Sequence, residues 1–103
     1  MYVRTIPKTF KKHGYDYELH TDAGNGYRIY AQKKKGKVCA YEVIKVLSQR
    51  EAITPKGYLI EEGERYPKTS EWGLYGWTYL KLENAQAKLE LLSNQSKEAR
   101  VIK

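Results

Sequence analysis

Four lysines within five residues form the densest cluster of like charges in this 103-residue chain. They are Lys33, Lys34, Lys35 and Lys37, and Gly36 lies among them, so the segment has the composition of a turn. Lysine side chains on a turn project into solvent, where they can neutralise phosphate oxygens without disturbing a core. The segment therefore favours a phosphate-rich partner, and solvated surface lysines are the alternative interpretation.

Two further groups could extend this basic surface. Arg28 and Tyr30 share one face of the alternating segment that leads into the lysine turn, and we expect Tyr30 to be exposed. Basic residues beside strand-borne aromatic rings are how several small folds stack nucleic-acid bases. Lys11 and Lys12 lie on a basic N-terminal arm that enters the same sheet. These residues together predict a surface for nucleic acid, with RNA favoured, or for a nucleoprotein complex.

The charge distribution agrees with this prediction. Residues 1–50 contain eleven Lys and Arg against four Asp and Glu, a balance of +7, whereas residues 51–103 contain eight of each and balance to zero. The whole formal charge of +7 thus comes from the first half. Such asymmetry indicates a negatively charged partner, either nucleic acid or an acidic protein surface.

Other chemistry has little support in the sequence. The two histidines, His13 and His20, have no cysteine pair to complete a metal site, and Cys39 is expected to be a small buried residue within an apolar stretch. A glycine-rich turn at residues 24–26 precedes a strand rather than the helix that a phosphate loop needs. We therefore predict a non-enzymatic protein with no catalytic residue, metal or cofactor.

No apolar run approaches the roughly 20 residues of a membrane span. The first residues also lack the apolar stretch of a signal peptide. These observations predict a cytoplasmic protein without a membrane partner, and they leave the oligomeric state open.

Hydrophobic alternation predicts the elements that position the basic residues. Residues 15–20 and 27–32 alternate as half-buried strands, and residues 38–47 are apolar on both faces, as an interior strand would be. Residues 58–60 could add a short strand, and Thr69 or Ser70 could cap a helical turn. Gly73 and Gly76 bracket bulky aromatic residues, which indicates a tight turn.

One helix is expected near the end of the chain. Leu82, Ala85, Leu89 and Leu92 follow a three-and-four spacing, and Asn94 is a plausible stop. The predicted fold is α+β: an antiparallel sheet of three or four strands with this helix on one face. Three further strand residues, Leu19, Ile29 and Ile44, are expected in the core with Tyr17. The predicted organisation is a basic arm over residues 1–14, one domain over 15–94 and a polar tail over 95–103.

The chain resembles a family of small bacteriophage accessory proteins. The matching segments are Tyr41–Lys45, Glu64–Pro67, Trp72–Tyr79 and Leu82–Ala85, within a resemblance that covers roughly residues 15–92. The resemblance implies a sheet with a C-terminal helix and no catalytic residues. Proteins of this kind include inhibitors of CRISPR effectors, some of which engage guide RNA. The lysine cluster is not part of the shared pattern, so it would belong to this chain's own function.

A second functional hypothesis belongs to a different class. The aromatic segment Trp72–Tyr79 could be the contact surface of a protein–protein interaction or structural module, and the lysines would then serve solubility. Core packing is the simpler interpretation of Trp72 and Trp77.

Overall fold

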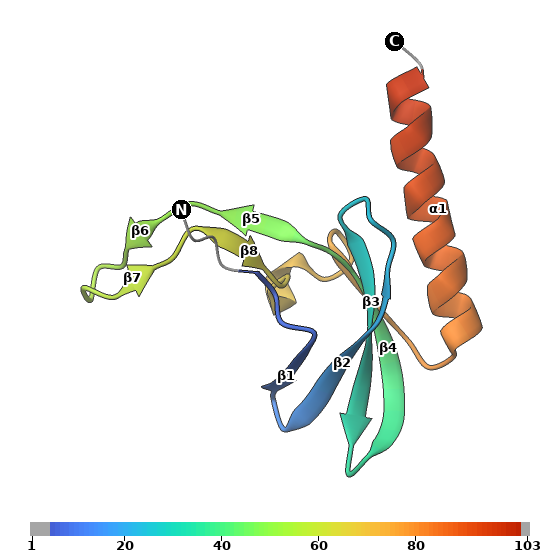
Figure 1. Ribbon diagram of the computed structural model, residues 1–103, viewed down its shortest axis with the longest axis horizontal. Helices are drawn as coiled ribbons and strands as arrows, with labels where there is room; N and C mark the ends of the chain where they lie inside the picture. Colours follow the sequence, from blue (N-terminus) through green and yellow to red (C-terminus); the bar gives the residue numbers. More distant parts are fainter. Residues whose placement is uncertain (1–4, 102–103) are drawn as a thin grey trace.

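The alternating segments pair into an antiparallel sheet, as predicted. The computed structural model describes the backbone of residues 5–101 and the side chains of residues 5–94 (Figure 1). The five strands of the sheet, in spatial order, are β1 (Thr9–Lys12), β2 (Tyr15–Asp22), β3 (Tyr27–Lys34), β4 (Lys37–Lys45) and β9 (Gly76–Tyr79). With helix α1 (Leu82–Val101) packed against this sheet, the α+β fold class is confirmed.

The sheet has more strands than the three or four expected, because each edge gains one. Strand β1 arises from residues assigned to the N-terminal arm, where Phe10 pairs with Tyr17 of β2. Strand β9 follows the glycine-rich turn and pairs with β4, which places β4 inside the sheet as predicted. The first part of the arm, residues 1–4, lies outside the described residues.

Smaller elements connect β4 to β9. Strands β5 (Leu47–Gln49) and β8 (Gly63–Arg65) pair with each other, and so do β6 (Ala52–Ile53) and β7 (Leu59–Ile60). A short 3-10 helix, η1 (Thr69–Glu71), follows, and its cap is Lys68 rather than Thr69 or Ser70. The hairpin of β6 and β7 projects away from the main sheet (Figure 1).

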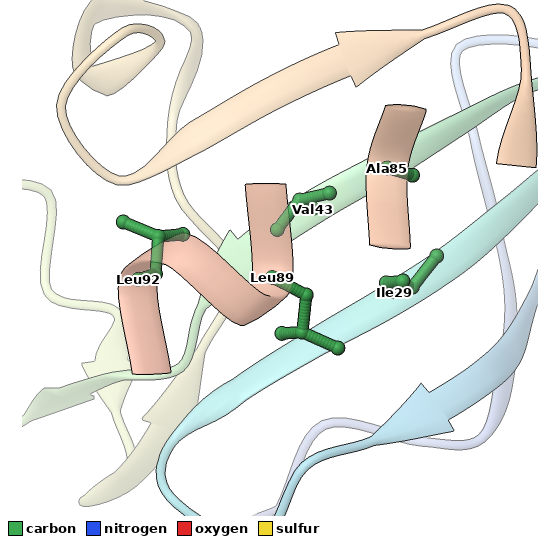
Figure 2. Close-up of a cluster of buried hydrophobic side chains, with 5 residues drawn as sticks. All are labelled: Ile29, Val43, Ala85, Leu89 and Leu92. Atoms are coloured by element: carbon green, nitrogen blue, oxygen red, sulfur yellow. The ribbon is translucent and has the colours of Figure 1, made fainter. Parts of the chain in front are cut away.

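Helix α1 covers one face of the sheet over β3, β4 and β9. Its buried residues Ala85, Leu89 and Leu92 pack against Ile29 and Val43, as Figure 2 shows. The predicted stripe is thus correct, although Leu82 is only partly buried. The predicted stop at Asn94 is wrong: no Gly or Pro follows it before Val101, and the helix continues to that residue. Residues 102–103 of the expected tail lie outside the described residues.

A second layer covers the opposite face of the sheet. Here Tyr17, Tyr30 and Ile44 form a buried cluster with Ile6 from the N-terminal segment. Figure 1 shows β5 and β8 on the side of the sheet away from α1. Tyr66 and Trp72, which follow β8, pack against this cluster, and Leu19, expected in the core, is partly exposed at its border.

Cys39 is exposed, so its predicted burial is wrong. The pairing of β3 with β4 shifts at this point: Gln32 lies opposite Ala40, whereas Lys33 lies opposite Val38. Cys39 is the extra residue of the resulting bulge, which takes it out of the regular alternation.

Candidate nucleic-acid interface

Two basic turns lie at the same end of the sheet. The β1–β2 turn contains His13 and Gly14, and the β3–β4 turn contains Lys35 and Gly36, all with positive φ angles between 52° and 82°. Because antiparallel strands return at alternate ends, both turns meet at one end, as Figure 1 shows. Lysines about 20 residues apart in the sequence are therefore neighbours at this end.

The strand register assigns these lysines to two faces. Lys12 is paired with Tyr15, and Lys34 with Lys37, on the face opposite the helix. The Lys34 ammonium lies 5.4 Å from the centre of the Tyr15 ring. These pairs bring positive charge and aromatic surface together across four strands.

Lys11 and Lys33 lie on the other face, where acidic residues of β2 accompany them. Lys33 Nζ is 3.2 Å from Glu18 Oε2, and Lys11 Nζ is 4.0 Å from Asp16 Oδ1. Both lysines are therefore partly neutralised within the protein. The exposed lysines Lys34, Lys35 and Lys37 carry most of the free charge at this end.

The prediction that Tyr30 is exposed is wrong, because its side chain has a relative exposure of 0%. Its hydroxyl donates to the Pro7 carbonyl oxygen at 2.9 Å and accepts from Arg28 Nη1 at 3.3 Å. Burial raises the pKa of the Tyr30 hydroxyl. The alternation of β3 correctly separates its two faces. The second layer covers the face that contains Tyr30, so this face is not exposed to solvent.

Arg28 belongs to the same buried network and is not available as a surface contact. Its Nε lies 3.4 Å from Asp22 Oδ2, and its Nη2 lies 3.6 Å from Glu64 Oε1. Glu64 Oε1 also accepts a hydrogen bond from the Ile6 amide at 3.0 Å. Arg28 therefore joins the N-terminal segment and β8 to the sheet.

An open pocket of about 570 Å³ lies beside the basic turns, on the face opposite the helix. Its walls contain four aromatic side chains, and its border contains basic and polar ones. The aromatic residues are Tyr15, Tyr17, Tyr66 and Trp72; the basic ones are Lys12, His13 and Lys68; Gln32, Glu42, Pro67, Thr69 and Thr78 complete the lining. The volume is within the range of about 300–1,000 Å³ that is usual for small-ligand sites.

Hydrogen bonds hold the aromatic walls in place. Tyr66 Oη donates to Glu42 Oε1 at 2.6 Å, and Trp72 Nε1 donates to Thr78 Oγ1 at 3.0 Å. Gly76 lies directly against the Trp72 ring, and an added Cβ would clash with the indole carbons. Gly76, one of the two glycines of the predicted tight turn, thus leaves the space that the indole fills.

Lys12 occupies this pocket instead of extending into solvent. Its ammonium lies 4.1 Å from the ring centre of Tyr66, 5.0 Å from that of Tyr17 and 5.8 Å from that of Trp72. It also lies 3.9 Å from Glu42 Oε1. Burial lowers the pKa of Lys12 despite the attraction of Glu42.

The sequence does not identify Tyr66, Glu42 or Lys68 as site residues, and it offers Trp72 only as part of the alternative contact segment Trp72–Tyr79. Tyr66 and Lys68 come from an irregular segment. No hydrophobic periodicity in this segment predicts that it packs against the sheet. Glu42 offered a signal, because a lone carboxylate inside the apolar run of β4 is buried only with partners.

The arrangement is suited to binding aromatic and anionic groups. Rings in the pocket can stack on a flat ligand, and the surrounding lysines can neutralise phosphates. Among the described residues, no three His, Cys, Asp or Glu side chains gather as a metal site would require. In the same part of the chain, no helix is long and apolar enough to cross a membrane.

No protein-family model matches the chain, and comparisons with curated proteins and with solved structures give no significant match.

Proposed function

We propose that this protein is a non-enzymatic binder of single-stranded RNA or of an RNA–protein complex. The observation that supports this proposal is the convergence of Lys34, Lys35 and Lys37 with the aromatic pocket at one end of the sheet. Phosphates would lie along the lysines, while an unpaired base would enter the pocket. A single strand suits this geometry better than a duplex, because duplex bases are stacked and their faces are inaccessible.

Charge reversal at the turn tests the proposal. Replacing Lys34, Lys35 and Lys37 with glutamate should abolish binding of a labelled single-stranded RNA, because phosphate neutralisation is replaced by repulsion. All three side chains are exposed, so the fold should be retained, as circular dichroism would verify. Single-stranded DNA and an RNA duplex measured in parallel should show which nucleic acid is preferred.

A matched control separates local contacts from net charge. Replacing exposed Lys45, Arg50 and Lys56 with glutamate also lowers the formal charge from +7 to +1, since each replacement removes two units. These residues lie at the far end of β4 and in the following segment, away from the basic turns. The control should keep most of the affinity. Equal losses in both variants would contradict a localised site.

The resemblance to small phage proteins adds a biological setting to this proposal. The protein would act in the cytosol of a bacterial host and would inhibit a CRISPR effector by engaging its guide RNA or the channel that holds it. In a reconstituted cleavage reaction, the wild-type protein should reduce target cleavage, and the lysine-to-glutamate variant should not.

A second candidate function is a protein–protein interaction module, and exposed apolar side chains favour it. Within the aromatic segment Trp72–Tyr79, Leu74 is 69% exposed, whereas Trp77 packs against the buried cluster between α1 and the sheet. The β6–β7 hairpin adds exposed Ile53, Tyr58 and Leu59. Light scattering would measure self-association, and retention of CRISPR inhibition by the lysine-to-glutamate variant would favour this candidate.

A further inference from the structure

The side chain of Lys12 lies inside the aromatic pocket, where a ligand would bind. Tyr17, Tyr66 and Trp72 surround its ammonium, and the carboxylate of Glu42 lies on the same side. An ammonium so placed compensates a carboxylate that is almost fully buried. Lys12 thus occupies the space in which a ligand would meet the aromatic rings.

The walls of the pocket are fixed more firmly than this occupant. Tyr17 Oη accepts a hydrogen bond from Gln32 Nε2 at 2.9 Å, and Tyr66 and Trp72 are held by the hydrogen bonds described above. Lys12 is held by cation–π contacts and by an ion pair of 3.9 Å, at the end of a flexible side chain on an edge strand. A ligand that enters the pocket would therefore displace Lys12 and leave the aromatic walls in place.

Displacement of Lys12 would leave the Glu42 carboxylate without its cation. A carboxylate only accepts hydrogen bonds, and Tyr66 Oη and Tyr17 Oη already donate to its two oxygens at 2.6 and 3.5 Å, so the incoming group must present donors to the lone pairs that remain. The guanine edge has adjacent N1–H and N2–H₂ donors, which match a carboxylate. Uracil has one N–H between two carbonyl oxygens, which would be repelled.

We propose that the pocket binds one unstacked guanine base, whose N1–H and N2–H₂ groups donate to Glu42 while Lys12 moves to the adjacent phosphate. This inference rests on the proposed function and adds base selectivity to it. The aromatic rings supply stacking that any base could use, and Glu42 supplies the discrimination. Lys68 at the border of the pocket, and Lys34 beside the Tyr15 ring, remain for flanking phosphates.

The test uses the full chain and two short RNA probes. One is a uridine oligomer, and the other is the same oligomer with guanine at its centre. The chain has two tryptophans, so a Trp77→Phe background leaves Trp72 as the reporter of stacking. The guanine probe should quench Trp72 fluorescence and bind about tenfold more tightly, as expected for a paired donor–acceptor contact.

Two variants assign the selectivity to residues. Glu42→Gln should remove the preference for guanine, because the amide presents a donor as well as an acceptor. Trp72→Leu should weaken binding of both probes by about five- to 150-fold, the loss expected when a base no longer stacks on an aromatic ring. Because Glu42 is buried, thermal unfolding should establish that the Glu42→Gln variant is folded, and Trp72→Leu tests the pocket independently of it.

The outcomes distinguish this inference from the proposed function. Equal binding of both probes without quenching would overturn the guanine pocket and leave RNA binding intact. Failure of both probes to bind at low salt would contradict both. A trimethyllysine peptide that quenched Trp72 while neither RNA probe did so would also overturn the inference, because the pocket would then be a site for cations.

Discussion

Glu71 fixes the conformation of the irregular segment that forms one wall of the pocket. Its two carboxylate oxygens accept hydrogen bonds from Arg65 Nη1 and Nη2 at 2.7 and 2.8 Å, and Oε1 also accepts from the Lys68 amide. These bonds, first those from Arg65, lower the pKa of Glu71 from its ordinary 4.5 to about 2. The segment they close contains Tyr66 and precedes Trp72.

This pair predicts an acid-sensitive contribution to stability. Because the folded state lowers the pKa of Glu71, the stabilisation is fully present above pH 4.5 and is lost as the pH falls towards 2. The difference in melting temperature between the wild type and Glu71→Gln should therefore shrink over this range. NMR of the Glu71 carboxyl carbon should give a midpoint near 2, and a midpoint near 4.5 would contradict the assigned contacts.

At the scale of elements, the contact of α1 with the sheet determines whether the domain is stable. Leu89 is 8% exposed and lies in the cluster shown in Figure 2, whereas Leu91 on the same helix is 50% exposed. Leu89→Ala should lower the free energy of unfolding by about 2–5 kcal/mol, because it removes buried apolar atoms and leaves a cavity.

Leu91→Ala is the matched control for this prediction. It makes the same chemical change at a half-exposed position and should alter the free energy of unfolding by less than about 0.5 kcal/mol. Urea denaturation of both variants measures the two values. Equal destabilisation would indicate that the helix does not pack as described.

Periodicity accounts for the elements that were predictable from the sequence. Strict alternation identified β2 and β3, and the three-and-four spacing of leucines identified α1. The edge strands β1 and β9 were missed because each has only four residues, too few for alternation to be distinctive. The bulge at Cys39 was missed for a related reason, since a single extra residue leaves no sequence pattern.

The candidate site was predictable only in its charged part. Exposure of Lys34, Lys35 and Lys37 is confirmed, because turn composition is a local property of the sequence. The burial of Tyr30 depends on a second layer made by distant segments around Ile6 and Tyr66, which local alternation does not encode. For the same reason, no local pattern could place Lys12 inside an aromatic pocket.

At the scale of the whole molecule, folding concentrates the charge of the first half of the chain. The sequence assigns all of the net +7 to residues 1–50, and the antiparallel topology brings the lysines of two turns to one end of the sheet. A field of one sign at one end should increase the rate of association with a polyanion and orient its approach. Affinity should therefore depend on ionic strength through a small number of phosphate contacts.

The salt dependence of RNA binding tests this account most directly. The affinity of the wild-type protein for a single-stranded RNA should be measured over a series of salt concentrations. Contacts with three or four phosphates, from the turn lysines and Lys12, predict a slope of about −2 to −3 when log K is plotted against log salt. The variant with glutamate at positions 34, 35 and 37 should not bind. Absence of wild-type binding at low salt, or an affinity that does not change with salt, would contradict the proposal that this basic end of the sheet binds nucleic acid.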